Sequence, residues 1–277
     1  MIFPQIFGTY EVMSIHSAPT RPHPAQNSPG PKPTSRHKTY FFSDAHLGLG
    51  SRAEDRQKEQ RIIQFLDYVK RDAEQLFIIG DLFDYWFEYK TVVPKGYFRL
   101  FAKIAELTDR GIHVTYVVGN HDFWIKEYFH DELGIDIQRD PIEREIHGRK
   151  FFIHHGDGLL KSDRGYRLLK RILRNRLCII LFSLVHPDLT GQIARWSSRK
   201  SRQYASARRY EGSDMVDFAA KKLRDGYDYV VMGHNHAAQF RHIGRGFYVN
   251  LGDWIFENSF AVFDGRRLEL RRWKPSR

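Results

Sequence analysis

Short apolar runs alternate with amphipathic stretches along the chain from residue 38 onward. In residues 54–70 the apolar side chains recur every three or four positions, which is typical of a helix with one buried face. Residues 97–110 repeat this pattern and are followed by Gly111, a residue type that commonly ends a helix. The runs between these helices are rich in β-branched and aromatic residues and predict strands. The predicted strands are residues 37–43, 76–80, 113–118, 150–154, 228–232, 247–251, 259–263 and 267–272.

The order of these elements predicts an α/β fold. Strands that alternate with helices form a mostly parallel sheet with helices on its faces. The last strands are separated by Gly-containing turns, so they predict an antiparallel continuation. Between residues 166 and 224 the strand pattern is missing, and the sequence there is compatible with helices. We therefore expect a helical insertion, or cap, at about residues 164–225.

The insertion contains the continuous apolar stretch LCIILFSLV, residues 177–185. It is much shorter than the roughly 20 residues that span a bilayer. Arginine residues precede it at positions 174 and 176 and follow it at positions 195 and 199. Continuous hydrophobicity is compatible with a buried core helix. The combination of apolar and basic residues also suits a surface that binds a lipid-like anion.

Residues 1–37 differ in composition from the remainder of the chain. They hold seven of the eleven prolines and a single acidic residue, Glu11. Pro-rich segments of low hydrophobicity bury too little surface to fold. We expect a flexible tail here, followed by one domain over residues 38–277.

Composition and charge narrow the classes of function. The single cysteine, Cys178, excludes an intrachain disulfide and suits a reducing compartment, and no signal-peptide pattern is present, so we expect a cytoplasmic protein. The net charge is +11, which favours an anionic partner. Residues 161–209 contain thirteen Lys or Arg and two acidic residues, a surplus equal to the net charge of the whole chain. Nucleic acid, anionic lipid and phosphorylated substrates all fit this surplus.

Polar residues of a particular kind follow five of the predicted strands. The carboxyl ends of strands are where open α/β sheets bind ligands. In an extended segment residues i and i+2 point to the same side, so Asp44 and His46 should converge, as should His234 and His236. Each pair or single residue has an ordinary structural explanation by itself, but five successive occurrences favour one site. The residues at the strand ends are Asp44, His46, Asp81, Asn120, His121, His155, His234 and His236.

Seven of these residues are potential metal ligands: two carboxylates, one amide and four imidazoles. This number exceeds what one tetrahedral site needs and suits two adjacent divalent metals that share a carboxylate. Two metals together can generate a nucleophile and stabilise the attacking and leaving oxygens of a phosphoryl transfer. The oxygen donors suit Mn, and the imidazoles also suit Zn or Fe.

The motifs DAH, GD, GNH, a lone His and GHNH resemble the calcineurin-like metallophosphoesterase family. The resemblance covers residues 38–272 and implies a sandwich of mixed β-sheets flanked by helices. It also implies one metal bound by Asp44, His46, Asp81 and His236, and a second bound by Asp81, Asn120, His155 and His234. Asp81 would then bridge the two ions, and His121 would stabilise the phosphoryl group or act as a general acid. The family favours Mn.

Within the family, GDLFDYW, GNHDFW, HHGDG and NLGDW resemble the branch of UDP-2,3-diacylglucosamine hydrolases, which release UMP and 2,3-diacylglucosamine 1-phosphate in lipid A synthesis. The implied partners are an anionic nucleotide-linked glycolipid and the cytoplasmic face of the inner membrane, with no protein partner. The best-known members of that branch have Arg where this chain has His121, the general metallophosphoesterase form. His can be neutral near pH 7, so the pH dependence should differ. The resemblance implies substrate contacts from Asn120, His121, Asp163, Tyr166, Ser201, Arg208 and His234.

Three other functions compete with this hypothesis. A phosphodiesterase or nucleotide pyrophosphatase for soluble compounds would not need the apolar stretch 177–185. A nucleic-acid phosphoesterase or binder would explain the charge, with Trp196, Tyr204 and Tyr210 available for stacking, but the chain contains no nucleic-acid motif. A non-catalytic scaffold should have lost ligands, and all seven are present.

Overall fold

The computed structural model describes residues 37–159, 164–193 and 213–274. Its first sheet has six strands in the order β11-β10-β1-β2-β3-β4. Strands β1 to β4 are parallel, whereas β10 and β11 continue the sheet in antiparallel pairing. These strands are β1 Lys38–Phe42, β2 Ala73–Ile79, β3 His113–Val117, β4 Asp136–Gln138, β10 Ser259–Phe263 and β11 Leu268–Arg272.

A second sheet of five strands has the order β5-β6-β7-β9-β8. Its three central strands are parallel, and each edge strand pairs with its neighbour in antiparallel fashion. These strands are β5 Ile142–Ile146, β6 Arg149–His154, β7 Tyr229–Met232, β8 Gln239–Ile243 and β9 Gly246–Asn250. The last predicted strands are therefore divided between the two sheets.

The two sheets pack face to face through alternating side chains. In β1, Phe41 points into the layer between the sheets, where its ring stacks on Phe77 of β2 and Phe151 of β6. The flanking residues Tyr40 and Phe42 belong instead to the core under the helices. This alternation is the period of two expected of a strand that is buried on both faces.

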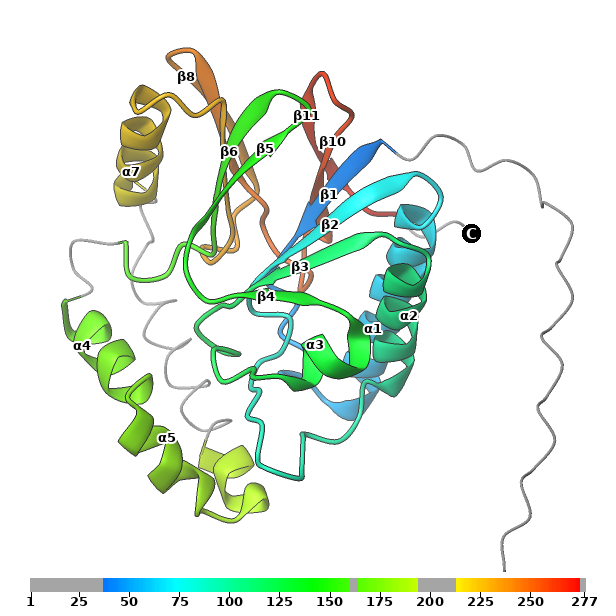
Figure 1. Ribbon diagram of the computed structural model, residues 1–277, viewed down its shortest axis with the longest axis vertical. Coiled ribbons are helices and arrows are strands. Elements are labelled where there is room, and N and C mark those ends of the chain that lie inside the picture. Colours follow the sequence, from blue (N-terminus) through cyan, green and yellow to red (C-terminus); the bar gives the residue numbers. More distant parts are fainter. Residues whose placement is uncertain (1–36, 160–163, 194–212, 275–277) are drawn as a thin grey trace, which may run out of the picture. The chain divides into compact units, whose positions relative to one another are not determined.

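Helices cover the outer faces of both sheets (Figure 1). The first sheet carries α1 Arg52–Val69, α2 Phe98–Asp109 and α3 Tyr128–Leu133. Helix α1 begins at a capping box, in which Ser51 and Glu54 satisfy each other's backbone N–H groups. The second sheet carries α7 Ser213–Arg224, which packs on β7 and β9. Two mixed sheets flanked by helices confirm the predicted α/β class.

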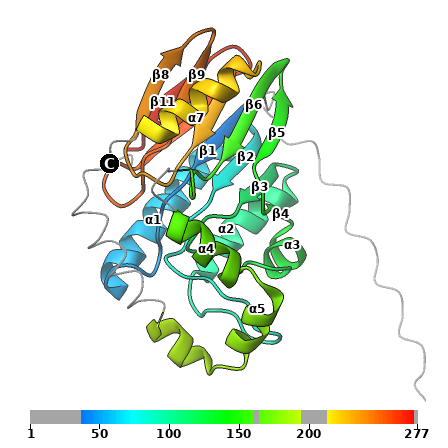
Figure 2. The ribbon, with the colours of Figure 1, turned by 90° about the vertical axis from the view of Figure 1, so that its left-hand side faces the viewer.

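The segment predicted to be helical contains α4 Arg164–Leu173 and α5 Arg176–Ser183, and residues 187–193 begin another helix. Figures 1 and 2 show α4 and α5 beside one end of the sheets, away from the faces that α1, α2 and α7 cover. Helix α5 has no buried residue, and Leu184 just after it is 77% exposed. The apolar stretch is therefore a surface element and not a core helix. Among the described residues, none of the helices is both long and apolar enough to cross a bilayer.

The sequence analysis did not predict β4, β5 or β8. The two edge strands β5 and β8 expose their three central residues, which are mostly charged or polar. Such strands lack an apolar run, and charge on an edge strand discourages pairing with other chains. The segment β4 is only three residues long. Hydrophobic periodicity therefore does not identify β4, β5 or β8.

An ion-pair network joins α1 to α2 and gives a testable effect on stability. Hydrogen bonds from Lys103 and Lys70, at 2.6 and 2.8 Å, lower the pKa of Glu106 to about 2. We expect Glu106→Gln to reduce the free energy of unfolding by about 0.5–1 kcal/mol at pH 7, a value discounted for solvent screening. Folding lowers the pKa of Glu106 from its value of about 4.3 in the unfolded chain. The difference in free energy of unfolding between the variant and the wild-type protein should therefore be complete above about pH 4.3 and should disappear as the pH falls through about 2.

Urea unfolding between pH 7 and pH 3 measures this difference. Glu132→Gln, on the exposed side of α3, is the control and should change stability little. If Glu106→Gln lowers the free energy of unfolding by the same amount at every pH, the loss of stability comes from packing and not from the charge of Glu106.

Candidate metal centre

The functional residues enter the site from the carboxyl ends of strands in both sheets. Strands β1, β2 and β3 lead into the first three motifs, and β6 and β7 lead into the last two. Five of the eight non-glycine residues with positive φ in the described part of the chain belong to this set. Left-handed backbone is unfavourable for such residues, and its concentration at one place is typical of a functional site. The five are Asp44, His46, Asp81, His234 and His236.

Backbone hydrogen bonds hold these turns in place. The N–H of Asp44 donates to Gly80 O at 3.1 Å, and the N–H of His46 donates to Asp81 O at 2.9 Å. The carbonyl of Asp44 accepts from Trp254 N at 3.0 Å. The DAH motif is therefore attached both to the neighbouring strand end and to the loop after β9.

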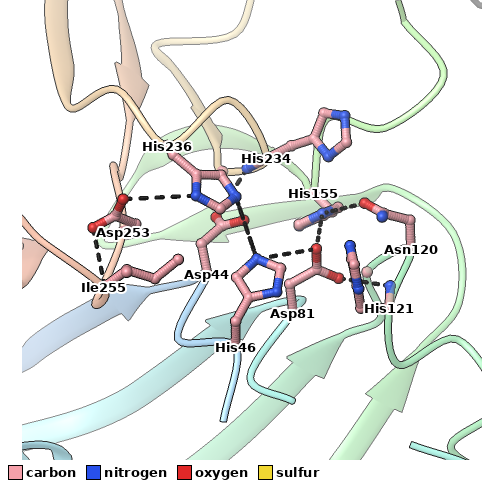
Figure 3. A network of polar contacts seen from close by, with 12 residues as sticks. Asp44, His46, Asp81, Asn120, His121, His155, His234, His236, Asp253 and Ile255 are labelled. Carbon is pink, nitrogen blue, oxygen red and sulfur yellow. Dashed lines mark hydrogen bonds and ion pairs between the residues drawn. The ribbon is translucent and has the colours of Figure 1, made fainter. Parts of the chain in front are cut away.

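One cluster of donors consists of Asp44, His46 and His236 (Figure 3). Nε2 of His46 and Nε2 of His236 face each other at 3.2 Å. Asp44 Oδ1 lies 3.4 Å from His236 Nε2 and 3.8 Å from His46 Nε2. This oxygen is buried without a hydrogen-bond partner among the described residues. Such an arrangement of lone pairs suits a cation that all three side chains contact.

A second cluster consists of Asp81, His155 and His234. Asp81 Oδ2 is 3.3 Å from His155 Nε2, and Asn120 Oδ1 is 3.1 Å from the same nitrogen. The same Asp81 oxygen lies 3.6 Å from His46 Nε2 of the first cluster. Asp81 is thus placed between the clusters, and the structure brings all seven predicted ligands together (Figure 3).

His121 lies beside the first cluster and is held by two groups. Its backbone N–H donates to Asp81 Oδ1 at 2.9 Å. Its ring nitrogen Nδ1 is 2.9 Å from Asp84 O and 3.7 Å from Asp84 Oδ1. The His121 ring also meets the His46 ring edge to face at 4.7 Å. The orientation of His121 is therefore fixed by Asp84 and by the metal-site carboxylate.

Three carboxylates that the sequence motifs do not single out orient the candidate ligands. Asp84 Oδ1 is 3.4 Å from His46 Nδ1, and Asp253 Oδ2 is 3.6 Å from His236 Nδ1. Such carboxylates fix the tautomer and orientation of a metal-binding histidine. Asp122 holds the GNH loop by accepting from Gly119 N at 2.9 Å. All three are acidic residues inside the quoted motifs GDLFD, GNHD and NLGDW, which is the signal that could have identified them.

Burial and charge set the protonation of the site. Burial would raise the pKa of Asp81, but the positive charge of His155 lowers it well below its usual range. Burial lowers the pKa of His234 to about 4, and burial also lowers the pKa of His121. Burial would lower the pKa of His46, but hydrogen bonds to Asp44 and Asp84 raise it to about 9. The carboxylates are ionised at neutral pH, and they attract either protons on neighbouring histidines or metal cations.

Several predicted substrate contacts cannot be placed. Asp163, Ser201 and Arg208 lie outside the described residues. Tyr166 lies in α4, but its side chain is also outside the description. Asn120, His121 and His234 are at the metal clusters, as described above.

The fold and the donor set together define a metal-dependent phosphoesterase. Mixed oxygen and imidazole donors, buried carboxylates and two adjacent clusters fit divalent cations. The model of the calcineurin-like phosphoesterase family matches residues 37–238, and the chain belongs to this family.

Relatives of known name agree with this class. The chain is 36% identical to a UDP-2,3-diacylglucosamine hydrolase of Porphyromonas gingivalis over 85% of this chain and 97% of the relative. It is 32% identical to the enzyme of that name from Pseudomonas fluorescens, over 77% and 86% of the two chains. A solved structure of an archaeal phosphodiesterase, 17% identical, covers 84% of this chain and 98% of its own with a TM-score of 0.44.

Proposed function

We propose that this protein hydrolyses the diphosphate of UDP-2,3-diacylglucosamine to UMP and 2,3-diacylglucosamine 1-phosphate, a step of lipid A synthesis. The observation that carries the proposal is a full set of seven donors in a chain 36% identical to a hydrolase of that name along nearly its whole length. The sugar-linked acyl chains require an apolar surface near the metals. The exposed apolar residues of α5 would supply this surface, and Phe182 of the same helix contacts Trp124, four residues after Asn120.

Each donor has a proposed role. Asp44, His46, Asp81 and His236 would hold one divalent ion, and Asp81, Asn120, His155 and His234 would hold the other. When bound, such ions polarise the phosphoryl oxygens and activate water at neutral pH. We propose Mn as the native metal, and metal analysis of purified protein distinguishes it from Zn and Fe.

His121 would act on the substrate itself. Its ring is tilted against His46 and held at Nδ1 by Asp84, so Nε2 is the nitrogen available to the substrate. Because Nδ1–H donates to Asp84 O, Nε2 carries a hydrogen only in the protonated ring, and in that form it can donate a hydrogen bond to a phosphoryl oxygen or a proton to the leaving group. Burial lowers the pKa of His121, and the negative charge of a bound phosphoryl group would favour the protonated form. Its fixed orientation supports this role.

The helical segment would hold the enzyme at the cytoplasmic face of the inner membrane. Leu177, Ile180, Leu181 and Leu184 are each more than half exposed, and Arg174 and Arg176 lie beside them. Apolar side chains next to basic ones are typical of elements that rest in a lipid interface. This surface would also receive the acyl chains of the substrate.

The direct test is an assay of purified protein with Mn and three compounds. We expect UMP release from UDP-2,3-diacylglucosamine to exceed by far the turnover of bis(4-nitrophenyl) phosphate and of UDP-N-acetylglucosamine. Turnover of bis(4-nitrophenyl) phosphate alone would keep the phosphoesterase class and reject the lipid substrate. Preference for UDP-N-acetylglucosamine would indicate a soluble nucleotide pyrophosphatase.

The role of the apolar surface has its own test. We expect the double variant Ile180→Ser, Leu181→Ser to lower kcat/KM for the diacylated substrate about 10-fold or more, because two exposed apolar contacts are lost. Turnover of bis(4-nitrophenyl) phosphate should change less than about 2-fold. Leu189→Ser, another half-exposed leucine outside α5, is the control. Equal losses on both compounds would exclude a role for this surface in substrate binding.

A further inference from the structure

The indole of Trp124 joins both helices α4 and α5 to the loop that carries Asn120 and His121. Its Nε1–H donates to Leu173 O, in the last residue of α4, at 3.1 Å. Its ring lies 4.6 Å from the Phe182 ring of α5, tilted by 30°. One side chain therefore contacts the end of one helix and the inner side of the next.

The surroundings of Trp124 are aromatic on the core side as well. The Phe87 ring lies 5.0 Å from both the Trp124 ring and the Phe182 ring. Phe87 and Trp124 also form a backbone bridge. The Arg174 guanidinium, between the two helices, lies 5.8 Å from the Phe123 ring. Phe87 follows Asp81 and Asp84 in sequence, so the cluster contacts two loops of the metal centre.

Hydrogen bonds of Asp122 hold the loop that leads to Trp124. Asp122, two residues before it, accepts from Leu82 N at 3.0 Å and from Gly119 N at 2.9 Å. Its carbonyl accepts from Ile125 N at 3.1 Å. Trp124 consequently stands at a fixed position relative to Asn120 and His121, and the helices are attached to that position.

Other contacts hold the helical segment at Lys170 in α4 and at Val185 and Thr190 beyond α5. Lys170 Nζ of α4 is 2.5 Å from Asp157 Oδ2, two residues after His155. Tyr89 OH lies 2.6 Å from Thr190 Oγ1, beyond α5. None of these contacts involves Leu173 or Phe182, the two residues through which Trp124 contacts the end of α4 and the inner side of α5.

We propose that Trp124 is a positioning residue that sets the place of α4 and α5 relative to the metal centre and so gives the enzyme its preference for acylated substrate. The inference rests on the proposed function, because it concerns the selectivity of the same site. Trp124 would not contact the reacting atoms. It would act through the helices whose exposed face is apolar.

The experiment compares Trp124→Ala, Trp124→Phe and the control Trp273→Ala in the full-length protein. Trp273 is also partly buried, and its ring contacts the rings of Phe65 and Tyr68. It is a suitable control because it directly follows β11 and is not part of the loops of the metal centre. We expect Trp124→Ala to lower kcat/KM for UDP-2,3-diacylglucosamine about 30-fold, from the lost ring packing and hydrogen bond. Turnover of bis(4-nitrophenyl) phosphate should change less than about 3-fold. Trp124→Phe keeps the packing without the donor and should lose about 3-fold on the diacylated substrate.

Limited trypsin digestion provides a readout that does not depend on the substrate. Cleavage within residues 164–193 should be faster in Trp124→Ala than in the wild-type protein or Trp273→Ala. Equal losses of turnover on both compounds, or unchanged cleavage, would overturn the positioning role. If the wild-type protein fails on UDP-2,3-diacylglucosamine, the proposed function is wrong, and the digestion alone decides whether Trp124 anchors the helices.

Discussion

Replacing Asp81 with alanine is expected to abolish turnover, with kcat lowered by at least about 1000-fold. Asp81 Oδ2 lies 3.6 Å from His46 Nε2 and 3.3 Å from His155 Nε2, so its loss affects both donor clusters. Its other oxygen accepts from His121 N, and this bond is lost too. Steady-state assays and metal analysis of the same sample measure the two consequences.

The metal content should fall below two ions per chain in Asp81→Ala. Asp81→Asn keeps the size of the side chain and one acceptor but loses the charge, so it should share most of the defect. Asp136→Asn is the control, because that carboxylate is more than half exposed in β4. Wild-type turnover with two bound ions in Asp81→Ala would exclude the shared-carboxylate arrangement.

The second large effect is expected from Gly119→Ala, which adds a single methyl group next to the site. A Cβ at Gly119 would overlap Asp81 Oδ1 and lie 2.6 Å from Asp81 N and 2.8 Å from Asp81 Cγ. Because Asp81 is buried and its N lies in the backbone, the overlap can be relieved only by moving the carboxylate or the loop. We expect kcat/KM to fall about 100-fold or more, since an error of about 1 Å in a catalytic group is enough for such a loss.

Gly165→Ala is the matched control for this change. Among the described residues, no atom lies within 4 Å of a Cβ at Gly165, and its position in α4 favours alanine. We expect its turnover to equal that of the wild-type protein. Full activity in Gly119→Ala would mean that the loop has room to move, and that the close packing against Asp81 has no functional importance.

The strands at the centre of the fold could be predicted from the sequence, because their apolar pattern and the polar residues that follow them both mark where each strand ends. The strands before Asp44, Asp81, Asn120 and His155 each end in four buried residues that are mostly apolar, and such runs differ clearly from the amphipathic helices beside them. The candidate ligands could be predicted because each of these strands is followed by a polar residue with metal-binding chemistry, and the structure places these residues close together. Recurrence at successive strand ends identified the site, and no single motif did so.

Features that depend on contacts between distant residues could not be predicted from the sequence. The stretch 177–185 was compatible with a buried helix, and only the contacts of Phe182 with Phe87 and Trp124 show which side faces the core. The division of the last strands between two sheets depends on long-range pairing that no local pattern encodes. The orienting roles of Asp84 and Asp253 depend on distances between residues far apart in the chain.

The pairing of β1 with β10 has a consequence for synthesis on the ribosome. Residues 39–41 pair with residues 261–263, so one edge of β1 has no partner until β10 has been synthesised. Contacts of such sequence separation form late and slow folding. During elongation Tyr40 and Phe41 belong to an incompletely covered, aromatic strand, which is the kind of segment that aggregates or recruits chaperones. The nascent chain is therefore exposed to aggregation until β10 leaves the ribosome and pairs with β1.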